Sequence, residues 1–189
     1  MSLFKKKKKE YHIRINLKAK FNAIGRAEIF EDTFDKVFKE VNLGEIDGGG
    51  TLLAQNGEPL ESDIEINLTK NPVEIKDVLI RLMDFGLPKG SSIITDNDQW
   101  SVGSLEGIGI YLNGTDLDEN VYKTSDIDLV ISEIIRLIGA DFKYYSFWEG
   151  ATETALYFYG NSFDNMKERI TPFLSTYPLC QKCRVVQIV

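Results

Sequence analysis

Hydrophobic and polar residues alternate with a period of two in several segments, which is typical of half-buried strands. Over residues 11–17, Ile13 and Ile15 fall on one face, and His12 and Arg14 fall on the other. Further strands are predicted over residues 45–53, 63–68, 91–95, 108–112, 142–148, 154–159 and 184–189. The pattern over residues 18–30 does not distinguish a longer strand from a crossover connection.

Apolar residues with helical spacing lie between these strands. Helices are predicted to begin at Asp32 or Thr33, at Asn71–Pro72, at Thr124–Ser125 and at Asn161–Ser162. Gly44, Gly86 and Gly139 follow the first three helices, at the position where a helix commonly ends in a left-handed residue.

The order strand, helix, strand, strand, helix, strand therefore occurs twice. It predicts an α+β protein of two tandem βαββαβ ferredoxin-like repeats, each an antiparallel sheet with helices on one face. We expect the repeats over residues 10–95 and 107–189, with a polar linker over 96–106 and a disordered basic tail over 1–9.

Aromatic residues on the hairpin over residues 142–159 fall on both faces of the predicted second sheet. Helices can bury only one of those faces. The sequence favours burial of the other face by packing between the repeats, and an aromatic patch covered by a partner is the alternative.

Three successive glycines, Gly48, Gly49 and Gly50, precede Thr51 in a predicted strand. A phosphate-binding loop would need a helix and a lysine after the glycines, and a strand follows here instead. The glycines are therefore explained either by a β-bulge or by the close approach of another backbone or a ligand.

Two further groups are candidate binding residues. Asp47, Asp63 and Glu65 crowd the same hairpin, where they could contact a cation or a basic partner, or form the solvated side of an edge strand. Trp100, in the polar segment between the repeats, and Trp148 with Glu149 at a strand end are candidate interface anchors, because tryptophan is enriched at binding hot spots. Packing of Trp100 or Trp148 over the edge of the core is the competing interpretation.

The sequence offers little catalytic chemistry. His12 is the single histidine, and no Ser-His-Asp or Cys-His set can be assembled without it. Cys180 and Cys183 form a lone CxxC, whereas structural zinc usually needs four ligands, so we expect reduced, semi-buried thiols. We therefore expect a binding protein rather than an enzyme, with no metal and no cofactor.

Charge narrows the class of partner. The net charge is −7, and without Lys5–Lys9 the chain has 17 basic and 29 acidic residues, a balance of −12. Such a body repels nucleic-acid phosphates and favours a basic protein partner. No apolar stretch approaches the ~18 residues of a membrane span, and the composition and cysteine usage indicate a cytoplasmic protein.

Glu28–Asp32, Gly44–Thr51 and Tyr177–Cys180 carry the patterns EIFED, GEIDGGGT and YPLC. These motifs resemble those of a group of uncharacterised bacterial proteins, and the resemblance covers most of the chain. It implies no catalytic residue. By size, charge and architecture the chain is also similar to immunity proteins, which neutralise secreted toxins.

We therefore expect an acidic protein-binding or inhibitor module, immunity-like, that recognises a basic partner by electrostatic complementarity. The alternative is a small-molecule sensor or enzyme that uses the groove between the repeats, near the glycines and the aromatic hairpin. A homo-oligomer formed through exposed sheet edges is a third hypothesis.

Overall fold

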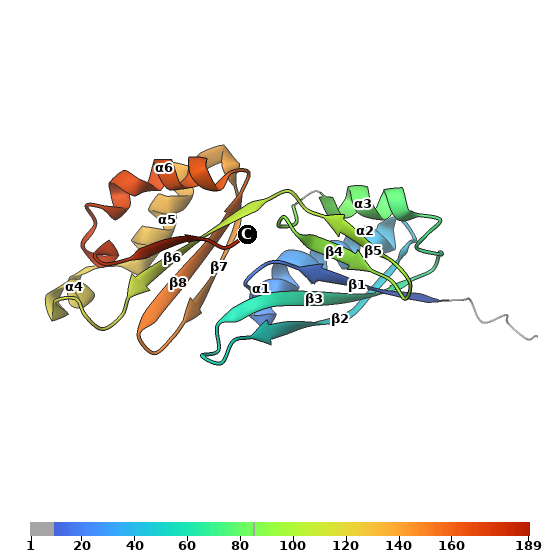
Figure 1. The fold of residues 1–189 in the computed structure, drawn as a ribbon, viewed down its shortest axis with the longest axis horizontal. Helices are drawn as coiled ribbons and strands as arrows, with labels where there is room; N and C mark the ends of the chain where they lie inside the picture. The colour runs from blue at the N-terminus through green and yellow to red at the C-terminus, as the bar shows by residue number, and fades with distance from the viewer. Residues whose placement is uncertain (1–9, 85) are drawn as a thin grey trace, which may run out of the picture.

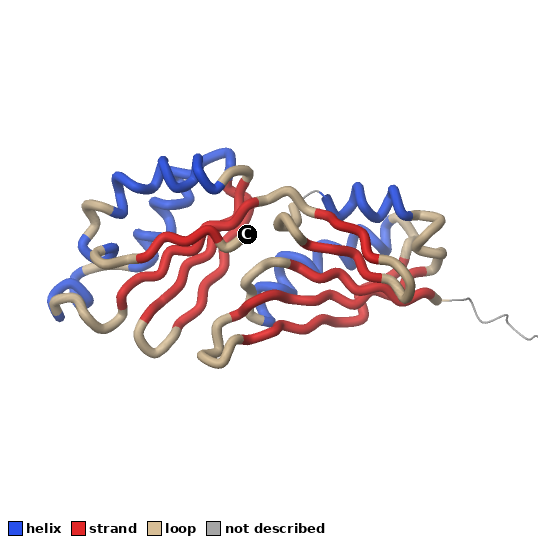
Figure 2. The backbone as a smooth tube through the Cα atoms, viewed as in Figure 1, coloured by secondary structure: helices blue, strands red, loops and turns tan. Residues whose placement is uncertain are grey.

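The computed structural model describes residues 10–84 and 86–189, and the predicted tail over residues 1–9 lies outside the described residues. Two antiparallel sheets lie next to each other, and each has helices on one face (Figure 1; Figure 2). Among the described residues, no helix combines the length and apolar character needed to cross a membrane.

The first repeat contains five strands and the helices between them. Its elements are β1 (Tyr11–Leu17), α1 (Ala23–Arg26), the π-helical turn η1 (Ala27–Glu31), α2 (Asp32–Glu40), β2 (Gly44–Leu53), β3 (Pro59–Leu68), α3 (Lys76–Asp84), β4 (Ser91–Ile94) and β5 (Gln99–Val102). Its strand order is β2-β3-β1-β4-β5.

The second repeat has the same plan without the fifth strand. Its elements are β6 (Glu106–Asn113), α4 (Glu119–Thr124), α5 (Ile127–Ile138), the 3₁₀ turn η2 (Gly139–Asp141), β7 (Phe142–Glu149), β8 (Glu153–Gly160), α6 (Phe163–Leu174), the 3₁₀ turn η3 (Pro178–Cys180) and β9 (Arg184–Gln187). Its strand order is β7-β8-β6-β9.

The two orders correspond strand by strand, because β1 and β3 are paired in the first sheet as β6 and β8 are in the second. In each repeat the last strand of the motif, β4 or β9, pairs with the first on its other side. This arrangement is the ferredoxin-like fold, and it confirms the predicted α+β architecture of two tandem βαββαβ repeats.

The segment predicted as a linker over residues 96–106 forms structure instead. Gln99–Val102 pair with β4 as strand β5, and the Thr95 N–H donates to the Asp98 carbonyl at 2.9 Å across the turn. The polar residues that suggested a boundary are thus a hairpin turn. The connection that remains is short, and it is fixed to the first repeat because the Leu105 N–H donates to the Leu87 carbonyl at 3.1 Å.

The first helix begins earlier than its apolar stripe predicts. The Asn22 side chain accepts a hydrogen bond from the Gly25 N–H at 2.8 Å, and this cap starts helical backbone at Ala23. One π-helical turn then interrupts the helix before α2. Residues 18–30 thus combine a loop, the helical turn α1 and most of the π-helical turn, which explains why their polar and apolar positions match neither simple period.

Two hydrophobic clusters fill the molecule. One lies between the second sheet and its helices α5 and α6. The other lies under the first sheet and also contains Tyr111, Tyr157 and Tyr159 from the opposite face of the second sheet. That face is therefore buried against the first repeat, and packing within the chain is the interpretation that the structure confirms for these aromatics.

Candidate functional site

The connection between β1 and α1 of the first repeat packs against the second repeat. Phe21 on this segment is fully buried, and its ring centroid lies 5.9 Å from that of Tyr159 and 5.4 Å from that of Phe30. The backbone around Lys20 is also held by the second repeat. The Lys20 N–H donates to the Tyr159 hydroxyl at 2.7 Å, and Ser146 Oγ donates to the Lys20 carbonyl at 2.5 Å.

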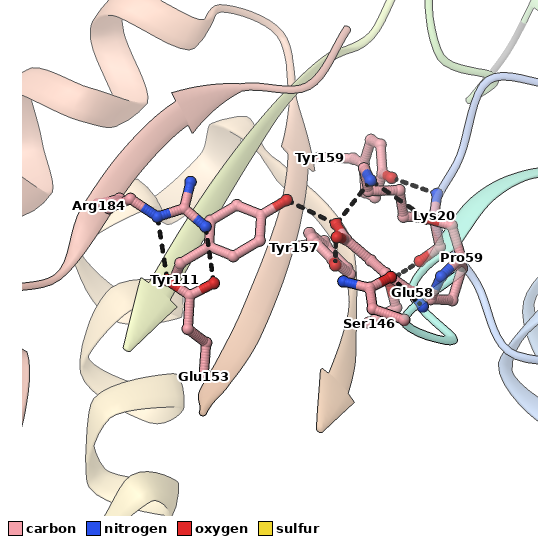
Figure 3. Close-up of polar contacts among 10 residues, drawn as sticks. Lys20, Glu58, Pro59, Tyr111, Ser146, Glu153, Tyr157, Tyr159 and Arg184 are labelled. Atoms are coloured by element: carbon pink, nitrogen blue, oxygen red, sulfur yellow. Dashed lines mark hydrogen bonds and ion pairs between the residues drawn. The ribbon is translucent and has the colours of Figure 1, made fainter. Parts of the chain in front are cut away.

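A carboxylate lies at the centre of this interface (Figure 3). Glu58, in the turn between β2 and β3, accepts hydrogen bonds at Oε1 from the Tyr111 hydroxyl at 2.6 Å and the Tyr157 hydroxyl at 2.8 Å. The same oxygen lies 2.7 Å from Lys20 Nζ, and both side chains of this ion pair are only about 15% exposed. Glu58 therefore connects the β2–β3 turn to the β1–α1 connection and to the face of the second sheet.

This environment determines which groups carry charge. Burial by itself raises the pKa of Glu58, but hydrogen bonds from Lys20, Tyr111 and Tyr157 outweigh burial and lower the pKa to about 2. Burial, followed by the hydrogen bond to Glu58, raises the pKa of Tyr111 to about 12. The cluster therefore contains one carboxylate with neutral phenol donors around it, and its hydrogen bonds link the two repeats.

Next to this cluster the surface between the repeats is hollowed. One cavity of about 490 Å³ lies between the β2 strand, the start of α1 and the end of β7. A second, of about 340 Å³, continues along β7 and the α1–η1 segment, and both cavities are lined by Asn22 and Phe147. We refer to the two adjoining cavities as the inter-repeat groove.

One wall of the groove is built on a buried ion pair. The guanidinium of Arg26 donates from Nε to Glu31 at 2.6 Å and from Nη1 to the Thr51 hydroxyl at 2.7 Å. Arg26 is only 7% exposed. Gly49 packs against this pair, because a Cβ there would lie 2.9 Å from both Arg26 Nε and Glu31 Oε1.

The other wall belongs to the end of β7. The Trp148 indole folds over the following turn, where a Cβ on Gly150 would lie 2.2 Å from its ring. Trp148 packs partly against the first core, whereas Phe147 is 44% exposed at the groove. Exposed Ile24 on α1 and Leu53 on β2 add apolar surface to the groove.

Two neighbouring glycines in β2 provide a matched test of this packing. Gly49→Ala places a methyl group 2.4 Å from the Asp63 carbonyl oxygen, so we expect a loss of about 1–3 kcal/mol in the free energy of unfolding. Gly50→Ala meets nothing within 4 Å, so we expect no loss, or a gain of about 0.5 kcal/mol. Urea denaturation measures both changes, and equal losses for the two variants would contradict the role given to Gly49.

The structure brings together about half of the predicted site residues. Gly49, Gly50 and Thr51 line the groove from the first repeat, and Trp148 and Glu149 line it from the second. The predicted bulge is also present, because the register shifts between Ile46 and Gly48, and Gly48 has φ of 139°. Gly48 itself lies next to the groove lining rather than in it.

The predicted acidic residues Asp47, Asp63 and Glu65 lie elsewhere, on or next to the sheet face that carries no helices. Glu65 Oε2 lies 2.6 Å from His12 Nε2, and Asn16 donates to Asp63 at 2.9 Å. A hydrogen bond to Asn67 raises the pKa of His12, and Glu65 adds to this effect.

Asp63 and Glu65 lie on β3, which is an internal strand and not the edge strand that the sequence suggested. β3 lies between β2 and β1 in the sheet, so these residues are not on an edge strand. Their neighbours on β1 already supply partners for both carboxylates. Of the three acids, Asp47 at the bulge is the one that is exposed.

Trp100 is not an exposed anchor. It is 8% exposed and belongs to the first core, with Lys76 Nζ lying 5.2 Å from the ring centroid. The reason is strand β5, because pairing with β4 directs alternate side chains of Gln99–Val102 into the core. Trp100 lies in strand β5 and not in the exposed polar segment that the sequence predicted.

The two cysteines of the CxxC lie at the end of η3 and just before β9. Cys180 is buried and Cys183 is half-buried, and both are free thiols. Burial raises the pKa of Cys180 to about 12 and also raises the pKa of Cys183, which favours the protonated thiol at both positions. Within the described part of the chain, no three His, Cys, Asp or Glu side chains gather as metal ligands would.

Several residues of the interface and groove have no signal in the sequence pattern. Lys20, Arg26 and Glu31 lie in or beside the segment that matches neither period, and Glu58 resembles any other acid of its hairpin. The Asn22 cap, followed by Arg26 four residues later, is the one local feature that could have indicated a helix start there.

Comparisons with known proteins add no family. No family model matches the chain, and no curated protein sequence matches it. Solved structures that align with most of this chain include an unknown protein from Galdieria sulphuraria. It is 10% identical over 95% of this chain and 98% of that one, with a TM-score of 0.29. A conserved bacterial protein from Streptococcus pneumoniae is 11% identical over 95% and 93%, with a TM-score of 0.28.

The first two RRM domains of a yeast poly(U)-binding protein are 11% identical over 94% of this chain and 99% of that one, with a TM-score of 0.29. At such TM-scores the likeness has no bearing on function.

Proposed function

We propose that this protein is a binding module that receives part of a basic protein partner in the inter-repeat groove. The observation that carries the proposal is the groove itself, which exposes Ile24, Leu53 and Phe147 together between the two repeats. Contiguous exposed apolar surface with a polar rim is typical of protein interaction sites.

Charge at the groove supports the same class of partner. Glu28 and Glu149 line its two cavities, and neither takes part in an ion pair formed among residues 10–84 and 86–189. The positive charge of Arg26 is already neutralised by Glu31. A partner with lysine or arginine beside its apolar contacts would therefore gain electrostatic attraction on approach.

The test is affinity capture with a matched pair of variants. Phe147→Asp adds a charge to the groove, and Leu129→Asp adds the same charge at an equally exposed apolar position on α5 (44% and 47% exposed). We expect the unmodified protein and Leu129→Asp to capture one basic protein that high salt releases. We expect Phe147→Asp to lose at least about tenfold in affinity for it.

Identical capture by all three proteins would contradict the groove as the site. Light scattering on the same samples shows whether the occupant is a second copy of the chain, since self-association would then fall in the Phe147→Asp variant alone. An immunity-like inhibitor is the form of this proposal that the sequence favours, and it requires a complex of defined stoichiometry with the basic protein.

A small ligand in the same groove is the second candidate. The observation that favours it is the Trp148 indole opposite Thr51 and the buried Arg26, since pockets for small molecules combine aromatic surface with few polar groups. A thermal-shift screen with nucleotides, amino acids and metal ions tests it. A stabilising compound whose effect is lost in Trp148→Ala would support this candidate, and the absence of any shift would count against it.

A further inference from the structure

The groove follows the outer edge of a strand. Tyr145, Ser146 and Phe147 line one cavity, and Phe147, Trp148 and Glu149 line the other. Consecutive side chains of a strand point to opposite faces of the sheet, so a cavity lined by every residue in turn runs beside the backbone. β7 is an edge strand with β8 as its neighbour, and Figure 1 shows it on the side of its sheet nearest the first repeat.

This edge has few of the features that normally prevent further pairing. Edge strands are usually blocked by inward charges, proline, bulges or a covering loop. The residues from Tyr144 to Trp148 contain no charge and no proline. The one register shift of β7 lies between Phe142 and Tyr144, before the part that lines the groove.

The wall opposite this edge leaves room for another backbone. Gly49 and Gly50 line the first cavity from β2, and Gly50 has no neighbour that would contact a Cβ. The absence of side chains permits close approach of a main chain. Among the described residues, no atom lies within 4 Å of a Cβ at position 50, so an external occupant gives this glycine a physical reason.

We propose that the partner segment binds in extended form and adds to β7 as a further strand beside Tyr145–Glu149. This inference rests on the proposed protein-binding function and specifies how that site recognises its occupant. Main-chain hydrogen bonds supply affinity in this mode of recognition, and alternate side chains supply specificity. The segment should alternate apolar residues with lysine or arginine, because Phe147 lines both cavities, and Glu149 in one and Glu28 in the other form no ion pair with any described residue.

The experiment uses the full chain and a phage-displayed library of random short peptides as the probe. Peptides are selected on the unmodified protein and counter-selected on Phe147→Asp. We expect enriched sequences with apolar residues at every second position and lysine or arginine between them. Hydrogen exchange measured with a synthetic copy should slow by about tenfold or more at those amides of Tyr145–Glu149 that point away from β8. Two further peptides are N-methylated at every second residue, one at the odd and one at the even positions. Only one of these two sets of N–H groups faces β7, so one peptide should lose binding and the other should keep it, because an N-methylated amide cannot donate a hydrogen bond.

The outcomes separate this inference from the proposed function. Peptides that need Phe147 but leave exchange at Tyr145–Glu149 unchanged would overturn strand addition while the groove remains the binding site. Slowed exchange at β2, β5 or β9 instead would assign strand addition to another edge and would equally overturn it. No enrichment after counter-selection, whether because the selected peptides also bind Phe147→Asp or because none bind, would overturn both.

Discussion

Glu58→Ala should destabilise the protein by about 3–5 kcal/mol, because it leaves the Lys20 ammonium partly buried without its counter-charge. Two phenol hydroxyls, of Tyr111 and Tyr157, lose their acceptor in the same change. Chemical denaturation measures the loss. The matched control is Glu119→Ala, which removes an exposed carboxylate paired with Lys123 and should cost less than about 1 kcal/mol. A similar cost for both variants would mean that Glu58 does not hold the repeats together.

The lowered pKa of Glu58 makes the free energy of unfolding depend on pH. Its pKa of about 2 in the folded protein lies below the ordinary value of 4.5, so ionised Glu58 favours folding. This contribution is complete above about pH 4.5 and is lost as the pH falls towards 2. The difference in unfolding free energy between the unmodified protein and Glu58→Gln should therefore shrink by on the order of 3 kcal/mol over that interval. A constant difference across the interval would contradict the assignment.

Phe21→Ala should have an effect of comparable size, about 3–5 kcal/mol, because it opens a cavity in the part of the core that both repeats share. The neighbouring Ile24→Ala removes an exposed side chain and should change stability by less than about 0.5 kcal/mol. Phe21 lies in the β1–α1 connection and Ile24 lies three residues later on α1, so their difference isolates burial between the repeats.

The Phe21 substitution also tests whether the repeats unfold together. The unmodified protein should unfold in one cooperative transition, because the first core includes side chains of both sheets. Loss of Phe21 should separate the transitions of the two repeats when they are followed by different probes. One unaltered transition with less than about 1 kcal/mol of destabilisation would show that the contacts of Phe21 do not couple them.

The groove is a product of this coupling. Its walls come from β2 and α1 in one repeat and from β7 in the other. Glu58 and Phe21 both make contacts across the interface next to the groove, and we expect these contacts to set the distance between its walls. Variants that loosen the interface should therefore weaken binding without altering a residue that lines the groove.

The repeated fold was predictable from the sequence because its signals are local. Alternation at Ile13 and Ile15 and the cap at Ser162 depend on neighbours within a few residues, and the structure contains both the strand and the cap. The glycine segment also indicated its bulge, because few other residues adopt the positive φ of Gly48. Gly49–Thr51 and Trp148–Glu149 could be proposed as binding residues for the same reason, as unusual residue types in their local context.

Only the tertiary structure decided which of these residues share a site. Trp100 and Trp148 were both candidate interface anchors in the sequence. Pairing of β5 with β4 buries Trp100, whereas Trp148 lines the inter-repeat groove. Glu58 acquires its role from Tyr157, 99 residues further along the chain. Arg26 ends the one-turn helix α1, directly before a π-helical turn, and no simple period describes this segment. A local pattern determines which face of an element is buried, whereas contacts between distant segments determine what that face is buried against.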